Sequence, residues 1–119
     1  MSEDNRLYPR FRIGLRVTAL GFEFTTTNLS LSGAQIACSE SIYKLISGKL
    51  ESRELRLTLH LTQSAIDLTA RIPYVSSYGE ESLIGLQFQK FENDGHELLE
   101  AFIVERKGED FVHPAAPAA

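Results

Sequence analysis

The sequence predicts a mainly β fold: a small six-stranded antiparallel β-barrel followed by an amphipathic C-terminal helix. Apolar and polar residues alternate with period two along most of the chain, the pattern of strands with one buried face. Turn-forming residues divide the alternating stretches into six short segments, and the spacing becomes helical near the C-terminal end. A length of 119 residues gives one domain with a modest core.

The first three strands are expected over residues 11–19, 22–28 and 34–38. In the first, apolar side chains take every second position, and arginines and a threonine face the other side. Gly21 marks a turn, after which a segment rich in aromatic and β-branched residues returns beside the first strand. A short polar turn separates the second strand from the third, so these segments form a meander of antiparallel strands.

Residues 39–53 are less regular, and their apolar spacing suggests one helical turn that covers an end of the barrel. Alternation then resumes, until Pro73 interrupts it and implies a bulge or a sheet edge at that point. Residues 74–81 are expected to be a turn region. The last three strands are therefore predicted over residues 54–61, 66–72 and 84–88.

Helical spacing begins near Asp94, which with Glu97 resembles a capping box, and continues to about Arg106. The end of the chain has no periodicity and contains two prolines, so we expect disorder there. The predicted organisation is a flexible leader over 1–10, the barrel with its helix over 11–107, and a disordered tail over 108–119.

Composition and charge exclude several classes of protein. No apolar run approaches the roughly 20 residues of a membrane span, and the first residues lack the apolar segment of a secretory signal. A net charge of −4 argues against general affinity for nucleic acid polymers or anionic membranes. The single cysteine, Cys38, is expected to be a buried structural thiol, and it excludes an internal disulfide. We expect a protein of the reducing cytoplasm.

Two arginines four residues apart, Arg6 and Arg10, stand just before the first predicted strand. Pro9 disfavours helix for the residue before it, so this segment is expected to be extended or turned. Guanidinium forks bind guanine edges, bridge phosphate oxygens or stack on a purine ring. The surrounding residues 5–16 contain four arginines and no acidic residue. Such a strip suits a small anion better than a polymer, with a solvated basic tail as the alternative.

A second cluster, Asn28, Ser30 and Gly33, lies at the end of the second predicted strand. Asn and Ser two residues apart can present an amide and a hydroxyl on one side of the strand. Glycine permits a positive φ and lets a ligand approach the backbone closely. The alternative is an ordinary Asx-type turn that closes a hairpin. With the arginines, this cluster suggests a pocket for an anionic ligand that contains a purine.

Together the two motifs, Arg-x-x-x-Arg and Asn-x-Ser-x-x-Gly, resemble those of the PilZ domain, over about residues 5–106. The similarity includes the third basic residue Arg16, the Ile-Gly-Leu-Gln-Phe stretch at 84–88 that is typical of the last strand, and the closing helix. It implies a bacterial receptor for the second messenger cyclic di-GMP. The residues that this resemblance assigns to the ligand, which lies on the outer surface of the barrel, are Arg6, Arg10, Asn28, Ser30 and Gly33.

Two positions depart from the family's pattern. Asn28 stands where aspartate is commoner, which removes a negative charge near a dianionic ligand. Asn5 stands where many members carry another arginine, one that favours a stacked pair of ligand molecules. The stoichiometry, one or two ligands per protomer, is therefore left open by the sequence.

No catalytic set accompanies the motifs. The three histidines, His60, His96 and His113, lack the spacing of a metal triad, and no base is positioned near Ser30 or Ser32. We therefore expect no enzymatic activity, no metal and no cofactor.

The expected output of a single stand-alone domain is a protein–protein event. The partner would be an unidentified effector protein, contacted by a monomer or weak dimer. Ordering of the arginine segment, residues 6–10, on a dianionic ligand would provide the switch. The alternative is a PilZ-fold adaptor that acts through protein contacts without nucleotide, although adaptor-type members usually lack both motifs.

Overall fold

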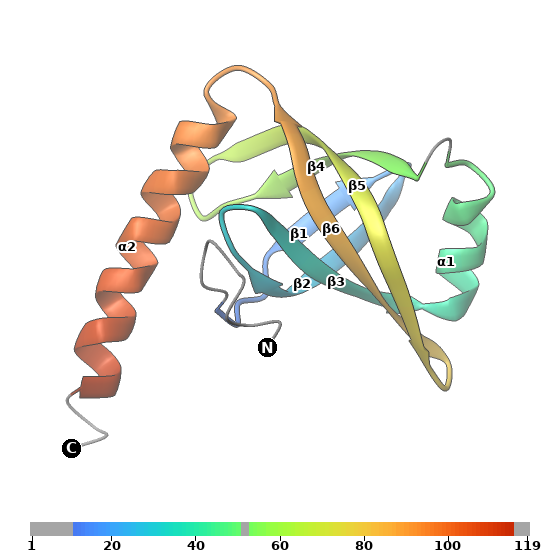
Figure 1. Ribbon diagram of the computed structural model, residues 1–119, viewed down its shortest axis with the longest axis horizontal. Helices are drawn as coiled ribbons and strands as arrows, with labels where there is room; N and C mark the ends of the chain where they lie inside the picture. Colours follow the sequence, from blue (N-terminus) through green and yellow to red (C-terminus); the bar gives the residue numbers. More distant parts are fainter. Residues whose placement is uncertain (1–10, 51–52, 116–119) are drawn as a thin grey trace.

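The structure is a computed structural model that describes residues 11–50 and 53–115, with side chains to residue 106. Six antiparallel strands close into a barrel in the order β1-β2-β3-β6-β5-β4, with helices α1 and α2 at its two ends (Figure 1). This confirms the predicted fold class. In chain order the elements are β1 (Arg16–Ala19), β2 (Phe22–Leu29), β3 (Gly33–Ser39), α1 (Glu40–Ser47), β4 (Glu54–His60), β5 (Ala65–Tyr78), β6 (Glu81–Phe91) and α2 (Gly95–Ala115).

The inner face of the barrel is built by the alternation that the sequence shows. Each strand contributes apolar side chains at every second position, and almost all of them are fully buried. The partners across neighbouring strands repeat this parity, as in the pairs Ile36–Ile84 and Leu57–Leu68. The inward set includes Val17, Phe24, Leu29, Ile36, Leu57, Leu59, Ile66, Leu68, Ile72, Ile84 and Leu86.

The two helices complete the core at the barrel ends. Ser39 caps α1 by accepting a hydrogen bond from the Ile42 N–H at 3.2 Å, and Ile46 is fully buried. The expected single turn is thus a complete eight-residue helix. Early in α2, Leu99 and Phe102 are buried on the barrel side. Within the described part of the chain, neither helix has the length and hydropathy that a membrane crossing requires.

α2 extends through residues 108–115, which were predicted to belong to a disordered tail. Most residues just after Arg106 have ordinary helix propensity, so the helix can propagate beyond its packed first turns. The predicted flexible leader stays a prediction, since residues 1–10 lie outside the described residues, and so do residues 116–119 of the predicted tail.

β1 is shorter than predicted because a side chain replaces part of its ladder. The N–H of Leu15 donates to the hydroxyl of Thr26 at 2.8 Å, and that hydroxyl donates to the carbonyl oxygen of Ile13. Thr26 is buried, and the register of β2 against β3 shifts just after it. The residues before Arg16 therefore run beside β2 without forming a regular strand.

The expected turn at 74–81 is mostly strand. β5 continues to Tyr78 and pairs with β6 up to Glu81, so that only Gly79 and Glu80 turn the chain. Pro73 does mark an irregularity, because the register shifts between Arg71 and Tyr74. The long β5–β6 hairpin reaches beyond the barrel wall beside α1 (Figure 1), where the Glu40 N–H donates to the Glu80 carbonyl oxygen.

Candidate functional site

The chain immediately after the first motif pairs with the strand that carries the second. The N–H of Phe11 donates to the carbonyl oxygen of Leu29 at 3.1 Å, and the N–H of Leu29 donates back at 3.0 Å. Leu29 stands between Asn28 and Ser30 in the sequence. Phe11 directly follows Arg10 in the sequence, so the Phe11–Leu29 bridge holds the residue after the first motif beside the second motif. Arg6 and Arg10 themselves lie outside the described residues.

Ser30 is fully buried, and its N–H and hydroxyl form their hydrogen bonds with atoms of its own turn. Its N–H donates to the carbonyl oxygen of Gly33 at 2.8 Å. Its hydroxyl accepts from the N–H of Ser32 at 3.2 Å and lies 3.1 Å from the Ser32 hydroxyl. The Ser30 side chain therefore shapes the β2–β3 turn, as expected if the second motif is an ordinary turn that closes a hairpin. Ser32 is the exposed serine of this turn.

Gly33 is required by the neighbouring strand. Its φ lies outside the positive range, which removes one of the two reasons for glycine given by the sequence. The other reason was the close approach of a neighbouring group, and here that group belongs to the protein itself. A Cβ at Gly33 would overlap the carbonyl oxygen of Leu86 and lie 3.3 Å from its carbonyl carbon. Gly33 is paired with Gln87 of β6 and buried. Its role in the structure is tight packing of β3 on β6.

Polar side chains line the outer face of β2, β3, β6 and β5 next to this turn. Asn28 is half-buried and pairs with Gln35, whose Nε2 donates to the Tyr74 hydroxyl at 3.0 Å. On the next strand pair, Arg71 Nη1 donates to Gln87 Oε1 at 3.3 Å. We call this surface the outer patch, defined by Asn28, Ser32, Gln35, Arg71, Tyr74 and Gln87.

A cavity of about 260 Å³ lies within the outer patch, lined by Ser32, Pro73, Tyr74, Leu86 and Gln87. It is smaller than a typical pocket for a drug-sized molecule, so it suits one ring of a larger ligand. The sequence did not indicate Gln35, Arg71, Tyr74 or Gln87, because only strand pairing places them beside the second motif. For Gln35, Arg71 and Gln87 a usable signal was parity, since residues an even number apart on a regular strand share a face. Parity fails for Tyr74, because the register shifts between Arg71 and Tyr74.

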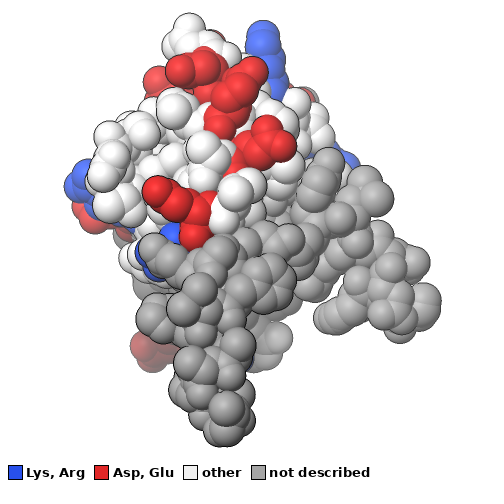
Figure 2. Space-filling view, turned by 90° about the vertical axis from the view of Figure 1, so that its left-hand side faces the viewer, with Lys and Arg blue, Asp and Glu red and all other residues white. Residues whose placement is uncertain are grey.

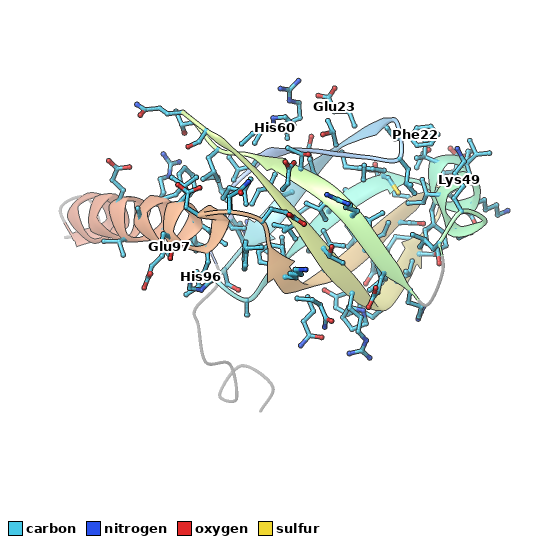
Figure 3. All side chains as sticks on the ribbon, turned by 90° about the horizontal axis from the view of Figure 1, so that it is seen from above. Phe22, Glu23, Lys49, His60, His96 and Glu97 are labelled. Atoms are coloured by element: carbon cyan, nitrogen blue, oxygen red, sulfur yellow. The ribbon has the colours of Figure 1, made fainter. Side chains whose placement is uncertain are left out.

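Arg16, the third basic residue of the resemblance, lies on another part of the barrel. Its Nε is 3.9 Å from Glu23 Oε2, and its Nη2 is 3.5 Å from His60 Nδ1. Figure 3 shows Glu23 and His60 along one side of the barrel, with His96 at the start of α2. Among residues that the structure describes, no cluster of His, Cys, Asp and Glu side chains is arranged to hold a metal ion.

Cys38 lies on β3 and is half-buried, less than the full burial that the sequence predicted. Burial, and secondarily the negative charge of Glu81, raise the pKa of its thiol. A raised pKa lowers the thiolate fraction, so this cysteine is a poor nucleophile at neutral pH.

On the α2 side of the molecule, acidic side chains gather over the described surface (Figure 2), and they disfavour an anion there.

The family model of the PilZ domain matches residues 3–105 of the chain. Comparison with curated proteins finds no match. The Bacillus subtilis inhibitor of motility (MotI/DgrA) superposes with a TM-score of 0.72 at 17% identity, over 88% of this chain and 52% of that chain. The K. pneumonia MrkH–c-di-GMP complex superposes with a TM-score of 0.67 at 17% identity, over 97% of this chain and 55% of that chain. The PilZ domain of Escherichia coli YcgR with c-di-GMP gives 0.56 at 16% identity, over 92% and 98%.

The chain spans about half the length of the first two of these proteins and nearly all of the third. At these identities the superpositions show the fold, the closed barrel with its C-terminal helix. The family match is broader, because it covers most of the chain and includes both sequence motifs. The PilZ domain is a receptor domain without catalytic function. This chain belongs to the PilZ domain family.

Proposed function

We propose that this protein is a receptor for cyclic di-GMP that converts ligand binding into altered protein–protein contacts. The observation that carries the proposal is the Phe11–Leu29 bridge, which holds the residue that directly follows the arginine leader beside the Asn28–Gly33 turn. The proposal is that the two motifs, which are separate in the sequence, border one surface. Proteins of the same fold from Escherichia coli and K. pneumonia have been solved with c-di-GMP, which supports this class of ligand.

The chemistry of the ligand matches the groups at this surface. Cyclic di-GMP carries two phosphates and two guanines, and guanidinium groups recognise both phosphate oxygens and the guanine O6/N7 edge. Arg6 and Arg10 are the proposed clamp, and Arg12 is exposed one residue past the bridge. Asn28 offers an amide without adding the negative charge of an aspartate. Ser30 and Gly33 act in this proposal by shaping the turn, while Ser32 presents the exposed hydroxyl.

The proposed output is an ordering of the leader. A dianionic ligand held between the arginines and the barrel would fix residues 6–10 on the outer surface and create a new contact face. The partner of that face would be an effector protein. Because the leader is continuous with the segment bonded to β2 at Thr26, ordering requires no rearrangement of the core.

Isothermal titration with cyclic di-GMP tests the proposal. A heat of binding is expected at 100 µM ligand, which corresponds to about −5.5 kcal/mol or better. Cyclic di-AMP and the linear dinucleotide are expected to bind more weakly, since they lack the guanine edges or the closed ring. Lys44→Ala on α1, at the far end of the barrel, should leave the affinity unchanged and serves as the charge-matched control. Absence of heat with folded protein would refute the receptor function.

The burial of Ser30 favours a second candidate, an adaptor that keeps the fold and acts without nucleotide. In that case the motif persists because the turn needs it. An adaptor would show no heat with cyclic di-GMP, and its melting temperature would be the same with and without ligand. A receptor at 100 times its Kd would instead gain about 2.7 kcal/mol of stability.

A further inference from the structure

The end of β5 forms an open edge of the sheet. β5 pairs with β4 only as far as Arg71, and the next contact on that side is the Ile72 N–H, which donates to the Arg53 carbonyl oxygen at 2.9 Å. The remaining segment, Tyr74–Tyr78, pairs with β6 in the hairpin that reaches beyond the barrel wall (Figure 1). Its other edge meets no strand among the residues that the structure describes. Such an edge is a template for an additional strand.

The hairpin register shows which main-chain groups face this open edge. Tyr78 and Glu81 enclose a two-residue loop, so they form a hydrogen-bonded pair, and such pairs alternate along an antiparallel ladder. The N–H and C=O groups of Val75 and Ser77 therefore point away from β6, toward the open edge. In the described part of the chain, no group forms a hydrogen bond with them there. Both residues thus offer a donor and an acceptor to a further strand.

The segment lacks the features that usually protect an edge strand. Residues 74–78, Tyr-Val-Ser-Ser-Tyr, include no charged residue, no proline and no glycine, and the tyrosines and the valine favour strands. Tyr74 is 41% exposed and Tyr78 65% exposed, on the face opposite to Val75, which packs against the core. The order of residues is nearly the same in both directions, with a tyrosine at each end. A strand of this kind is complementary to itself when it runs antiparallel.

We propose that this edge binds a second copy of the chain, through antiparallel pairing of the two β5 strands about a two-fold axis at Ser76. In this register Val75 of each copy exchanges both of its outward hydrogen bonds with Ser77 of the second copy. Tyr74 lies directly opposite Tyr78 of the second copy, in a non-hydrogen-bonded pair where the side chains come closest. The interface is isologous, as a two-fold axis requires. It involves no nucleotide, so it does not depend on the proposed receptor function.

The charges at the two ends of the segment agree with the antiparallel arrangement. An antiparallel second strand brings its hairpin tip, with Glu80, to the place where β5 leaves β4. Arg53 and Arg71 are exposed at that place, and neither they nor Glu80 form an ion pair with a described residue. A parallel strand would instead place the two acidic tips side by side. Electrostatic complementarity therefore favours the antiparallel orientation and helps to fix its register.

Analytical ultracentrifugation of the parent protein tests the association. A single strand pair is a small interface, in the weak class below about 1,200 Å². We therefore expect a Kd of about 100 µM, with mostly monomer at about 10 µM protein and mostly dimer at about 1 mM. Ser77→Pro removes an N–H that faces the open edge and leaves the ladder with β6 intact. This variant should raise the Kd for dimerisation by about tenfold or more.

Substitutions of Ser76 test the register, because the two-fold axis places this residue opposite itself. Ser76→Lys and Ser76→Glu should each dimerise more weakly than the parent, since like charges then face each other, and an equimolar mixture of the two should associate again. Ser76→Cys should form an intermolecular disulfide under mild oxidation, because directly opposed Cα atoms about 4.5 Å apart permit one. Ser77→Cys has no self-partner in this register and is the matched control. Both cysteine variants are made in a Cys38→Ser background.

Each experiment has a result that would overturn the proposal. A parent protein that stays monomeric at about 1 mM would exclude self-pairing and leave the edge to a strand of another protein. A dimer of unchanged affinity in folded Ser77→Pro and Ser76→Lys would place the interface elsewhere. Cross-linking of Ser77→Cys as efficient as that of Ser76→Cys would exclude the axis at Ser76. Circular dichroism and the melting temperature show which variants keep the barrel, and the Ser76 series decides if Ser77→Pro does not fold.

Discussion

Gly33→Ala should destabilise the barrel before it affects any ligand. The added Cβ would overlap the carbonyl oxygen of Leu86, a backbone atom of the paired strand that cannot rotate away as a side chain does. β3 and β6 would have to separate or twist locally, and such overpacking costs about 1–3 kcal/mol. Because the clash involves backbone in a continuous ladder, we expect the upper half of that range, about 2–3 kcal/mol. For a domain of this size this lowers the melting temperature by about 8–12 °C.

Thermal and urea denaturation of the ligand-free proteins measure this effect. Gly48→Ala is the control, since Gly48 has a φ of −72° and its nearest Cβ contact would be the Leu45 carbonyl oxygen at 3.8 Å. That variant should be neutral or more stable by up to about 1 kcal/mol. If Gly33→Ala melted like the parent and lost only its affinity for cyclic di-GMP, the glycine would be making room for the ligand and our assignment would be wrong.

Three further predictions concern the leader and the core. Arg6→Ala and Arg10→Ala should each weaken cyclic di-GMP binding by about ten- to a hundredfold, the loss of a charge-assisted contact worth about 1.5–3 kcal/mol, without lowering the melting temperature; a sharp fall in stability would show a structural role. The amide of Leu7 should exchange more slowly with ligand than without it, and equal rates would contradict the proposed ordering. Ser82→Ala should keep or raise stability by up to about 2 kcal/mol in urea titrations, because its buried hydroxyl has no hydrogen-bond partner in the described structure. A loss above about 1 kcal/mol would reveal such a partner.

Period-two alternation was sufficient to predict the barrel, because burial of one face is a local property that each strand shows in its own sequence. It fails where pairing departs from the regular ladder. The start of β1 was misplaced because the Thr26 hydroxyl, a distant side chain, takes the place of backbone partners. The end of β5 was missed because Pro73 and the polar residues after it resemble a turn, although the strand continues outside the barrel.

Only part of the candidate site could be predicted from the sequence, because the other residues come together through strand pairing. Asn28, Ser30 and Gly33 are close in the chain, so their spacing indicates a shared turn. Gln35 and Tyr74 are 39 residues apart and meet only through the pairing of both strands with β6. The bulge that turns Tyr74 outward also reverses its expected parity. Sequence periodicity placed this residue in a turn, and the sheet places it on the outer patch.

The second motif combines residues of two kinds, and this bears on how such a site tolerates change. Ser30 and Gly33 are buried and hold the turn and the β3–β6 contact, so substitutions there act on the fold and on every surface beside it. Asn28 and Ser32 are accessible, so substitutions there can alter ligand contacts while the barrel persists. A chain that lost its ligand would therefore be expected to keep the serine and the glycine. Retention of those two residues indicates the turn, and evidence for a ligand has to come from the arginines and the outer patch.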